Sequence, residues 1–269
     1  MVHFVGAGPG AVDLITVRGK KLIGEADVII YAGSLVNPAL LEYAKRDAEI
    51  YDSAQLTLEE VTDIMKTACA EGKEVVRLHT GDPSIYGAVR EQMDILDEAG
   101  EEYDSTPGVS SFCAAAAALD MEYTLPGISQ SVIITRMEGR TPVPEKESVE
   151  ALSVHGATMV FFLSAGDTGR LSDRLKEAGL SPDTPCAIVY RASREDEKKL
   201  ICTLDTLQRS AEENNISRTA LIIVGKAVLQ SGYERSRLYS PDFSTGYRKK
   251  TLTDDQDKEL CRKSVKDAE

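Results

Sequence analysis

Val2-His3-Phe4-Val5-Gly6-Ala7-Gly8-Pro9-Gly10 opens the chain as a short apolar strand that runs directly into a glycine-rich turn. Glycine lets such a turn adopt positive φ angles and lets other segments approach closely. In open α/β sheets, ligands bind where turns of this kind follow the carboxyl ends of parallel strands. The stretch therefore predicts an α/β fold with a ligand site beside residues 6–10.

Short β-branched runs alternate with amphipathic helices through the first half of the chain. The predicted strands are residues 2–5, 27–31, 49–51 and 74–78. Thr57 and Glu60 form a capping-box pattern before an apolar helical stripe, and Gly72 follows that stripe as a helix stop. Strands separated by helices of this length pair in parallel. Residues 1–120 are therefore expected to form an α/β domain with a mainly parallel sheet.

The second half repeats this alternation with one difference. Its predicted strands are residues 131–135, 158–163, 187–190, 199–202 and 220–224, with helices at 166–178 and 204–214. Residues 191–198 leave room only for a hairpin, which predicts a mixed sheet. The alanine run 114–118 predicts a helix that leads into a link near 121–127. We expect a second α/β domain over 121–241, a ligand cleft between the two domains, and a weakly ordered or weakly helical polar tail over 242–269.

Composition narrows the class of partner. The 269 residues carry 31 Lys and Arg against 44 Asp and Glu, a formal charge of −13. Nucleic-acid binders gain most of their affinity from basic residues on phosphates, so no nucleic-acid partner is expected. The chain shows no signal-peptide pattern, no apolar run that could span a membrane, and five scattered cysteines without disulfide or zinc spacing. We therefore expect a cytoplasmic protein with no membrane association and no metal site.

The letters of the first turn match the dinucleotide signature G-x-G-x-x-G/A, but the surrounding sequence does not support a dinucleotide site. Pro9 removes a backbone N–H that should donate to a phosphate, and the first plausible helix cap is as late as Thr16. No acidic residue ends the second strand, where a ribose-binding carboxylate is expected. A simple tight turn and a ligand-binding turn are equally compatible with the pattern, and a ligand without phosphates fits it better than a dinucleotide.

Two further glycine-bearing turns share the context of the first. Gly81-Asp82-Pro83-Ser84 follows the strand at 74–78, and Pro107-Gly108-Val109-Ser110-Ser111 precedes the alanine-rich helix. Each is ordinary turn chemistry by itself. Together they are predicted to line one edge of a single crevice.

These three motifs, in this order and spacing, resemble the tetrapyrrole methylase family. The resemblance covers residues 2–248. It implies two α/β domains, a cleft for S-adenosylmethionine between them, a tetrapyrrole substrate and a homodimer. Residues 31–36, 125–142, 155–159 and 243–248 also resemble the branch that methylates carbon C11 of a corrin precursor on the route to vitamin B12. Ala32 stands where uroporphyrinogen-III methyltransferases carry Asp, which disfavours that activity.

The resemblance also implies the residues of a cofactor site. Carried over by motif, they are Pro9, Gly81, Asp82, Ile85, Ser110 and Ser111 from the first domain, and Leu163, Ala192, Thr219, Ala220 and Leu221 from the second. Core packing of the strands is the alternative explanation for Leu163 and Ala220.

A substrate with many carboxylates calls for Arg or Lys in the cleft, because guanidinium groups recognise carboxylates well. Arg136 and Arg140 are the preferred substrate-binding residues. Arg77, Arg191 and Arg194 are further candidates by position.

Methyl transfer needs alignment of two bound molecules rather than a protein nucleophile. The catalytic residues therefore stay unknown, and Asp82, His79 and Glu138 are weak candidates for a general base.

Several alternatives stay open from the sequence. Within the family, they are methylation at another ring position or of a protein, as diphthine synthase does. Outside it, the first turn could serve a nucleotide-dependent oxidoreductase, or the fold a ligand sensor without turnover. The sequence does not say whether the substrate carries cobalt.

Overall fold

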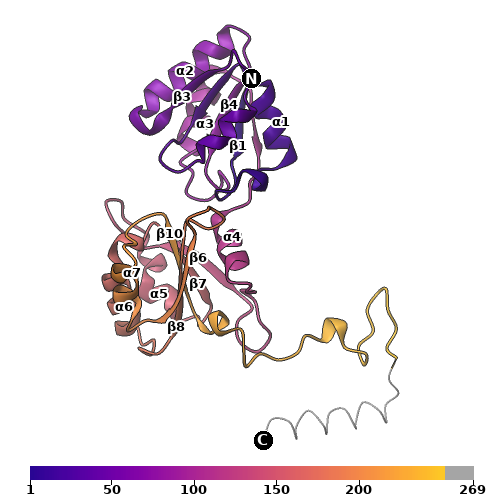
Figure 1. Cartoon of the computed structure of the whole chain (residues 1–269), viewed down its shortest axis with the longest axis vertical. Helices are drawn as coiled ribbons and strands as arrows, with labels where there is room; N and C mark the ends of the chain where they lie inside the picture. Colours follow the sequence, from indigo (N-terminus) through magenta and orange to yellow (C-terminus); the bar gives the residue numbers. More distant parts are fainter. Residues whose placement is uncertain (252–269) are drawn as a thin grey trace, which may run out of the picture.

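The computed structural model describes residues 1–251 as two α/β domains and a C-terminal arm. In Figure 1 one domain lies above the other, and the arm leaves the lower one. The part of the predicted tail from residue 252 onward lies outside the described residues.

The first domain contains a parallel sheet in the order β3-β2-β4-β1-β5. Its strands are β1 (Val2–Gly6), β2 (Val28–Tyr31), β3 (Glu49–Asp52), β4 (Val75–His79) and β5 (Tyr103–Thr106), and its helices are α1 (Val17–Glu25), α2 (Leu58–Ala70) and α3 (Arg90–Ala99). The chain leaves β1 toward β2 and leaves β4 in the opposite direction toward β5. The two neighbouring strands β1 and β4 therefore form the topological switch point, where open α/β sheets bind ligands.

Local sequence signals explain where the helices of this domain begin and end. The Thr16 hydroxyl accepts a hydrogen bond from the Gly19 N–H at 3.0 Å, which confirms the predicted cap of α1. Thr57 and Glu60 form both hydrogen bonds of a capping box at α2. Gly72 follows α2 with φ +73°, as predicted for a helix stop. Strand β5 and helix α3 are not among the predicted elements.

The second domain contains a mixed sheet in the order β6-β7-β10-β8-β9. Its strands are β6 (Val132–Arg136), β7 (Thr158–Phe162), β8 (Pro185–Tyr190), β9 (Lys198–Thr203) and β10 (Ala220–Val224), and its helices are α4 (Ser111–Ala118), α5 (Val149–Ser153), α6 (Thr168–Glu177) and α7 (Leu207–Glu213). β6 and β7 pair in parallel, whereas β8 and β9 form the predicted antiparallel hairpin.

Helix α4 packs on the second sheet, so the link between the domains differs from the prediction. Ala114 and Ala115 share a buried apolar cluster with Val160 of β7 and Ile223 of β10. The predicted boundary at 120/121 assigns this helix to the first domain. Small alanine side chains let α4 lie close to the sheet. The connection between the two domains is therefore residues 107–110, immediately after β5.

Both faces of each sheet are buried, as the alternation of apolar strands and amphipathic helices predicts. In residues 1–251, no helix has the length and apolar character needed to cross a membrane.

Candidate functional site

The three glycine turns meet at the carboxyl edge of the first sheet. We call residues 6–11, 80–87 and 106–111 the first rim. Gly8 and Gly81 exchange two backbone hydrogen bonds, at 3.2 and 2.8 Å. A Cβ on Gly6 would lie 2.5 Å from the Gly108 Cα, so the first and third turns are in direct backbone contact. The predicted convergence of the turns is confirmed.

Asp82 ties the second turn to the third. Its Oδ2 accepts the Gly108 N–H at 2.9 Å, and its Oδ1 accepts the Ser84 N–H at 2.9 Å and the Ser84 hydroxyl. Burial alone would raise the pKa of Asp82, but these hydrogen bonds outweigh it and the pKa is lowered. Asp82 is therefore a carboxylate that holds the rim together, and its lowered pKa disfavours it as a proton acceptor.

A second rim lies at one edge of the second sheet. It consists of Arg136 at the end of β6, Leu163 after β7, residues 191–194 after β8, and Thr219 before β10. Leu163, Arg191 and Thr219 have φ angles of +52°, +48° and +54°, a left-handed conformation that is strained for side chains other than glycine. The Arg191 N–H donates to the Thr219 carbonyl at 2.9 Å, which fixes two of these turns to each other.

Direct contacts show that the two rims face each other. The Ala11 N–H donates to the Ser193 hydroxyl at 3.0 Å, and the Arg194 guanidinium donates to the Leu35 carbonyl. The rings of Tyr86 and Phe162 lie 5.4 Å apart. Figure 1 places the N-terminus at the far end of the upper domain, so β1 runs toward the lower domain and its turn reaches the second rim.

The predicted cofactor residues therefore fall on two facing rims. Those from the first domain are Pro9, Gly81, Asp82, Ile85, Ser110 and Ser111. Those from the second domain are Leu163, Ala192, Thr219, Ala220 and Leu221. The Leu163 side chain is 74 % exposed, which is unusual for a leucine next to a core strand. Ala220 and Leu221 belong to the cores on opposite faces of the sheet, so only their backbone groups are available to a ligand.

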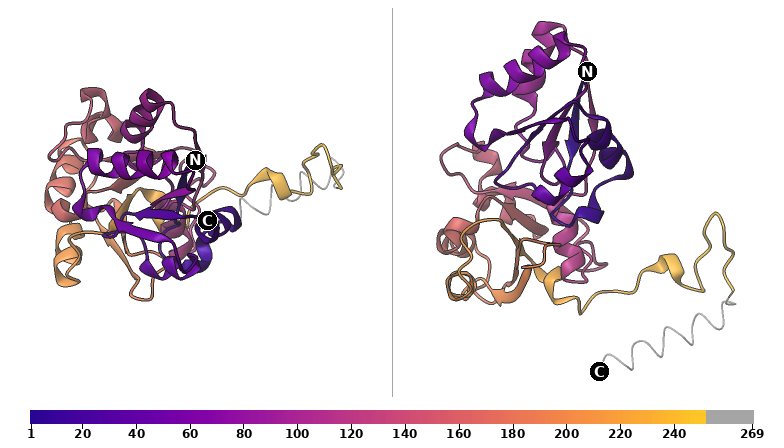
Figure 2. Two further views of the ribbon diagram at one scale, coloured as in Figure 1. Left: turned by 90° about the horizontal axis from the view of Figure 1, so that it is seen from above. Right: turned by 45° about the horizontal axis from the view of Figure 1, so that its top comes forward.

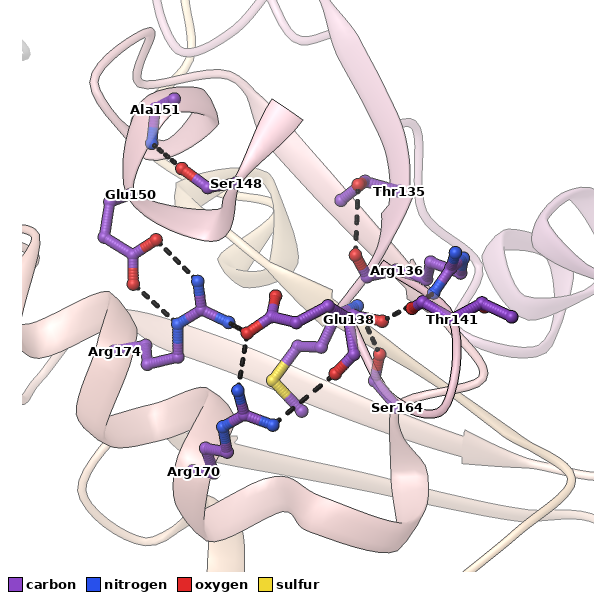
Figure 3. Close-up of polar contacts among 11 residues, drawn as sticks. Thr135, Arg136, Glu138, Thr141, Ser148, Glu150, Ala151, Ser164, Arg170 and Arg174 are labelled. Carbon is purple, nitrogen blue, oxygen red and sulfur yellow. Dashed lines mark hydrogen bonds and ion pairs between the residues drawn. The ribbon is translucent and has the colours of Figure 1, made fainter. Parts of the chain in front are cut away.

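Arg136 shapes the turn that follows β6. Its guanidinium donates to the carbonyls of Met137, Thr141 and Pro142 at 3.1, 3.2 and 2.8 Å. Figure 3 shows it folded back over this turn. Arg140 lies in the same turn, is exposed, and has no ion-pair partner within residues 1–251. Of the two predicted substrate-binding arginines, Arg140 is the one whose charged group is available.

Glu138 is part of an ion-pair cluster. Its carboxylate forms ion pairs with Arg170, at 2.5 Å, and with Arg174. Arg174 also forms an ion pair with Glu150, at 2.6 Å (Figure 3). The hydrogen bond from Arg174 holds the pKa of Glu138 below its usual range. Glu138 therefore fastens the turn after β6 to α6, and the structure does not favour it as a general base.

His79 and Arg77 lie inside the first domain. His79 is 5 % exposed and stacks on Phe4, and burial together with the charge of Arg77 lowers its pKa to about 3. Arg77 donates to Gln92 at 3.0 Å and to the Ile30 carbonyl at 3.2 Å. These partners leave His79 a poor base at neutral pH and remove Arg77 from the substrate-binding candidates.

The other two candidate arginines are also engaged. Arg191 forms an ion pair with Asp196 at 2.7 Å, and Arg194 lies over Gly10. Sequence patterns did not indicate that Ser193 and Arg194 join the rims, because a serine-arginine pair in a hairpin loop has no distinguishing signal. Within the described residues there is no cluster of three or more His, Cys, Asp or Glu that could hold a metal ion.

The fold defines a two-domain α/β protein, and the residues predicted to bind a cofactor lie on two rims that face each other between the domains. The family model of Tetrapyrrole (Corrin/Porphyrin) Methylases matches residues 1–208. The chain belongs to this family, which confirms the predicted class of enzyme, a methyltransferase.

Similarity extends along the whole folded part. A cobalt-precorrin-4 C(11)-methyltransferase of Methanocaldococcus jannaschii is 53 % identical over 248 residues, 92 % of this chain and 96 % of the relative. The X-ray structure of a cobalt precorrin-4 methyltransferase matches with a TM-score of 0.83 and 45 % identity, over 84 % of this chain and 95 % of that one. A Thermus thermophilus uroporphyrin-III C-methyltransferase complexed with S-adenyl homocysteine matches with a TM-score of 0.72 and 26 % identity, over 86 % of this chain and 99 % of that one.

Proposed function

We propose that the chain transfers the methyl group of S-adenosylmethionine to carbon C11 of precorrin-4 or its cobalt complex, a step of cobalamin biosynthesis. The observation that carries the proposal is the 53 % identity to a C(11)-methyltransferase along nearly the whole length of both chains. The two facing rims support it, because the residues proposed to bind the cofactor come from both domains and lie opposite one another. The proposal includes a cytoplasmic homodimer, as the family resemblance implies.

The rims fit S-adenosylmethionine better than a nucleotide with phosphates. Pro9 lacks the N–H that a phosphate would need, and the first rim contains no Lys or Arg. The glycines bring the turns of the first rim together with no side chain between them, so a ligand beside this rim meets mainly backbone. When bound, S-adenosylmethionine supplies a methyl group on a positively charged sulfur. Gly81, Asp82 and Ser110 of the first rim and Leu163 and Ala192 of the second would hold it.

The chain itself contributes alignment. Asp82 keeps two turns of the first rim together, and Ser193 and Arg194 keep that rim at a fixed position opposite the second. Fixing two reactants in a productive geometry contributes up to roughly 7–11 kcal/mol to catalysis. Arg140 is the group proposed to bind a carboxylate arm of the substrate, with Arg136 and the Glu138 cluster positioning its turn.

The test is to incubate the protein with precorrin-4, or in a parallel sample with cobalt-precorrin-4, and with S-adenosylmethionine labelled with ¹³C in the methyl group. Carbon NMR should then find the label at C11 in at least one sample. Label at any other carbon would overturn the proposed position, and the sample that reacts faster identifies the substrate.

Calorimetry with S-adenosylhomocysteine and with NADH tests the class of enzyme separately. We expect binding of S-adenosylhomocysteine alone. Binding of NADH without S-adenosylhomocysteine would favour the oxidoreductase alternative and contradict the methyltransferase.

A further inference from the structure

The C-terminal arm, residues 232–251, extends from the body and, after Glu234, forms no hydrogen bond with either domain within residues 1–251. Glu234 is its last attachment to the body, through an N–H bond of 2.9 Å to the Pro126 carbonyl. Within residues 1–251, the hydrogen bonds of residues 235–249 all stay inside the arm. Figures 1 and 2 show the arm extending away from both domains in every view.

Arg248 gives the arm a defined shape. Its guanidinium donates to the carbonyls of Leu238, Tyr239, Ser240 and Phe243 at 3.1, 3.2, 2.5 and 3.4 Å. A backbone hydrogen bond of 2.8 Å from Thr251 to Pro241 closes the same loop. A segment with this many internal bonds is pre-organised, which lowers the cost of ordering it against a partner.

The arm presents apolar and aromatic side chains to solvent. Tyr233, Leu238, Tyr239, Phe243 and Tyr247 are exposed, Tyr239 by 76 % and Tyr247 completely. Monomeric proteins rarely leave so many large apolar groups together on one segment. An aromatic side chain can bury roughly 150–250 Å², so two exchanged arms could cover on the order of 1,000 Å², the size that a specific interface needs.

Charge indicates what the arm contacts. Residues 232–251 contain five Arg and Lys against two Asp and Glu, a formal charge of +3. Residues 1–231 contain 22 Arg and Lys against 36 Asp and Glu, a formal charge of −14. The body of a second copy is therefore electrostatically complementary to the arm. An anionic membrane would attract the arm by the same charge, but it offers no apolar protein surface to cover the exposed side chains of the arm, and the vesicle experiment below separates the two partners.

We propose that the arm docks on a second copy of the chain, so that two copies exchange arms across a two-fold axis. This inference rests on the proposed homodimer and not on the proposed chemistry. It specifies that the dimer is held by arm residues rather than by contacts between the two bodies alone.

The first experiment compares full-length chains by sedimentation. We expect a dimer for the unmodified chain and a dissociation constant at least tenfold higher for the double variant Tyr239→Ala/Tyr247→Ala. Val154→Ala, a change at another exposed apolar residue outside the arm, should leave the constant unchanged. Binding of S-adenosylhomocysteine should be equal in all three, which separates this result from a failure of the proposed function. A monomeric unmodified chain, or a double variant that dimerises as well as the unmodified one, overturns the inference.

The second experiment identifies the partner. A photoreactive side chain at position 239 in ¹⁵N-labelled protein, mixed with the unmodified protein at natural abundance, should yield cross-links between labelled and unlabelled copies. Cross-links confined to one copy overturn the exchange. Arm-dependent co-sedimentation of monomers with vesicles containing anionic phospholipid would also overturn it in favour of a membrane.

Discussion

Both rims contain turns with positive φ angles, but they place different residues at those positions. The first rim places glycines where φ is positive or where turns touch, at Gly8, Gly81 and the Gly6–Gly108 contact. The second rim adopts the same left-handed conformation at Leu163, Arg191 and Thr219. Glycine takes that conformation freely, whereas other residues lose roughly 1–2 kcal/mol there. The first rim is therefore relaxed at its glycines, with Tyr86 (φ +54°) as an exception, whereas the second is held in shape by the sheet that carries it.

The difference explains why one rim was predictable from sequence and the other was not. Glycine-rich turns after apolar strands are a recognisable pattern, and Asp82 stands inside one. A leucine, an arginine and a threonine at strand ends look like ordinary core or surface residues. Only the resemblance to a known family points to Leu163 and Thr219 as cofactor-binding residues.

The largest effect is expected where the first rim is most tightly packed. In Gly108→Ala the new Cβ would overlap the Gly81 carbonyl oxygen and lie 2.8 Å from the Gly6 Cα. Overpacking of this kind should lower the free energy of unfolding by about 3 kcal/mol and abolish binding of S-adenosylhomocysteine. Urea unfolding and calorimetry would measure both. Gly246→Ala, which meets no atom within 4 Å, is the matched control, and equal losses in the two variants would contradict the packing argument.

Asp82→Asn removes a charged acceptor from the first rim and should lower the free energy of unfolding at neutral pH by about 2 kcal/mol. The folded-state pKa lies below the ordinary 3.8, so the contribution of the carboxylate is complete above that value. It is lost as pH falls through the folded pKa. Urea unfolding from pH 6 to pH 3 should show the two proteins converging below about pH 4. A difference that stays constant to pH 3 would count against the assigned hydrogen bonds.

The contact between the rims can be tested with a double-mutant cycle. A Cβ on Gly10 would lie 2.5 Å from the Arg194 Cγ. Gly10→Ala should therefore weaken binding of S-adenosylhomocysteine by about tenfold, roughly 1.4 kcal/mol. In the Arg194→Ala background the same substitution should cost almost nothing, because the colliding side chain is gone. Additive effects in calorimetry would show that Gly10 and Arg194 do not interact.

For the substrate, Arg140→Ala should raise KM for the tetrapyrrole severalfold and leave the affinity for S-adenosylhomocysteine unchanged, because a carboxylate arm loses its cation. Arg136→Ala should also raise KM but lower kcat as well, since the turn that carries Arg140 loses three hydrogen bonds. Steady-state kinetics separates the two outcomes. An unchanged KM in either variant removes that arginine from the site.

The smallest effect tests the strain in the second rim. Leu163→Gly should raise the free energy of unfolding by up to about 1 kcal/mol, because φ +52° suits glycine and the lost side chain is mostly exposed. Leu163→Val should lower it, since a β-branched residue tolerates this conformation poorly. Urea unfolding would measure both signs. Loss of stability in the glycine variant would show that the second rim is not strained at this position.

Most of the fold followed from local patterns. The predicted strands and the hairpin at 191–198 are present. The apolar runs in the sequence indicate the strands, and the short loop between two of them indicates the hairpin. Strand β5 was missed because Tyr103-Asp104-Ser105-Thr106 has only partial burial and no apolar run. The packing of α4 on the second sheet could not be predicted, since a helix face made of alanines can pack on the sheet of either domain.

The roles of the polar residues depended on partners far away in the chain. From the sequence, Glu138 and Arg136 were both candidates for the site. The structure gives both a structural role, because Glu138 binds Arg174 and Arg136 donates to carbonyls within residues 137–142. Likewise His79 precedes the Gly81-Asp82-Pro83 turn in sequence, yet its ring is buried against Phe4.

The short connection between the domains has an evolutionary consequence. Residues 107–110 are at once the third turn of the first rim and the entry to α4 of the second domain. A genetic crossover at this junction would divide the third turn from its contacts, since Gly108 contacts Gly6 and Gly81 on one side and Ser110 begins the helix on the other. The two halves are therefore not interchangeable modules. A domain taken from a different ancestor would keep these contacts only if residues 107–110 came with matching glycines at positions 6 and 81.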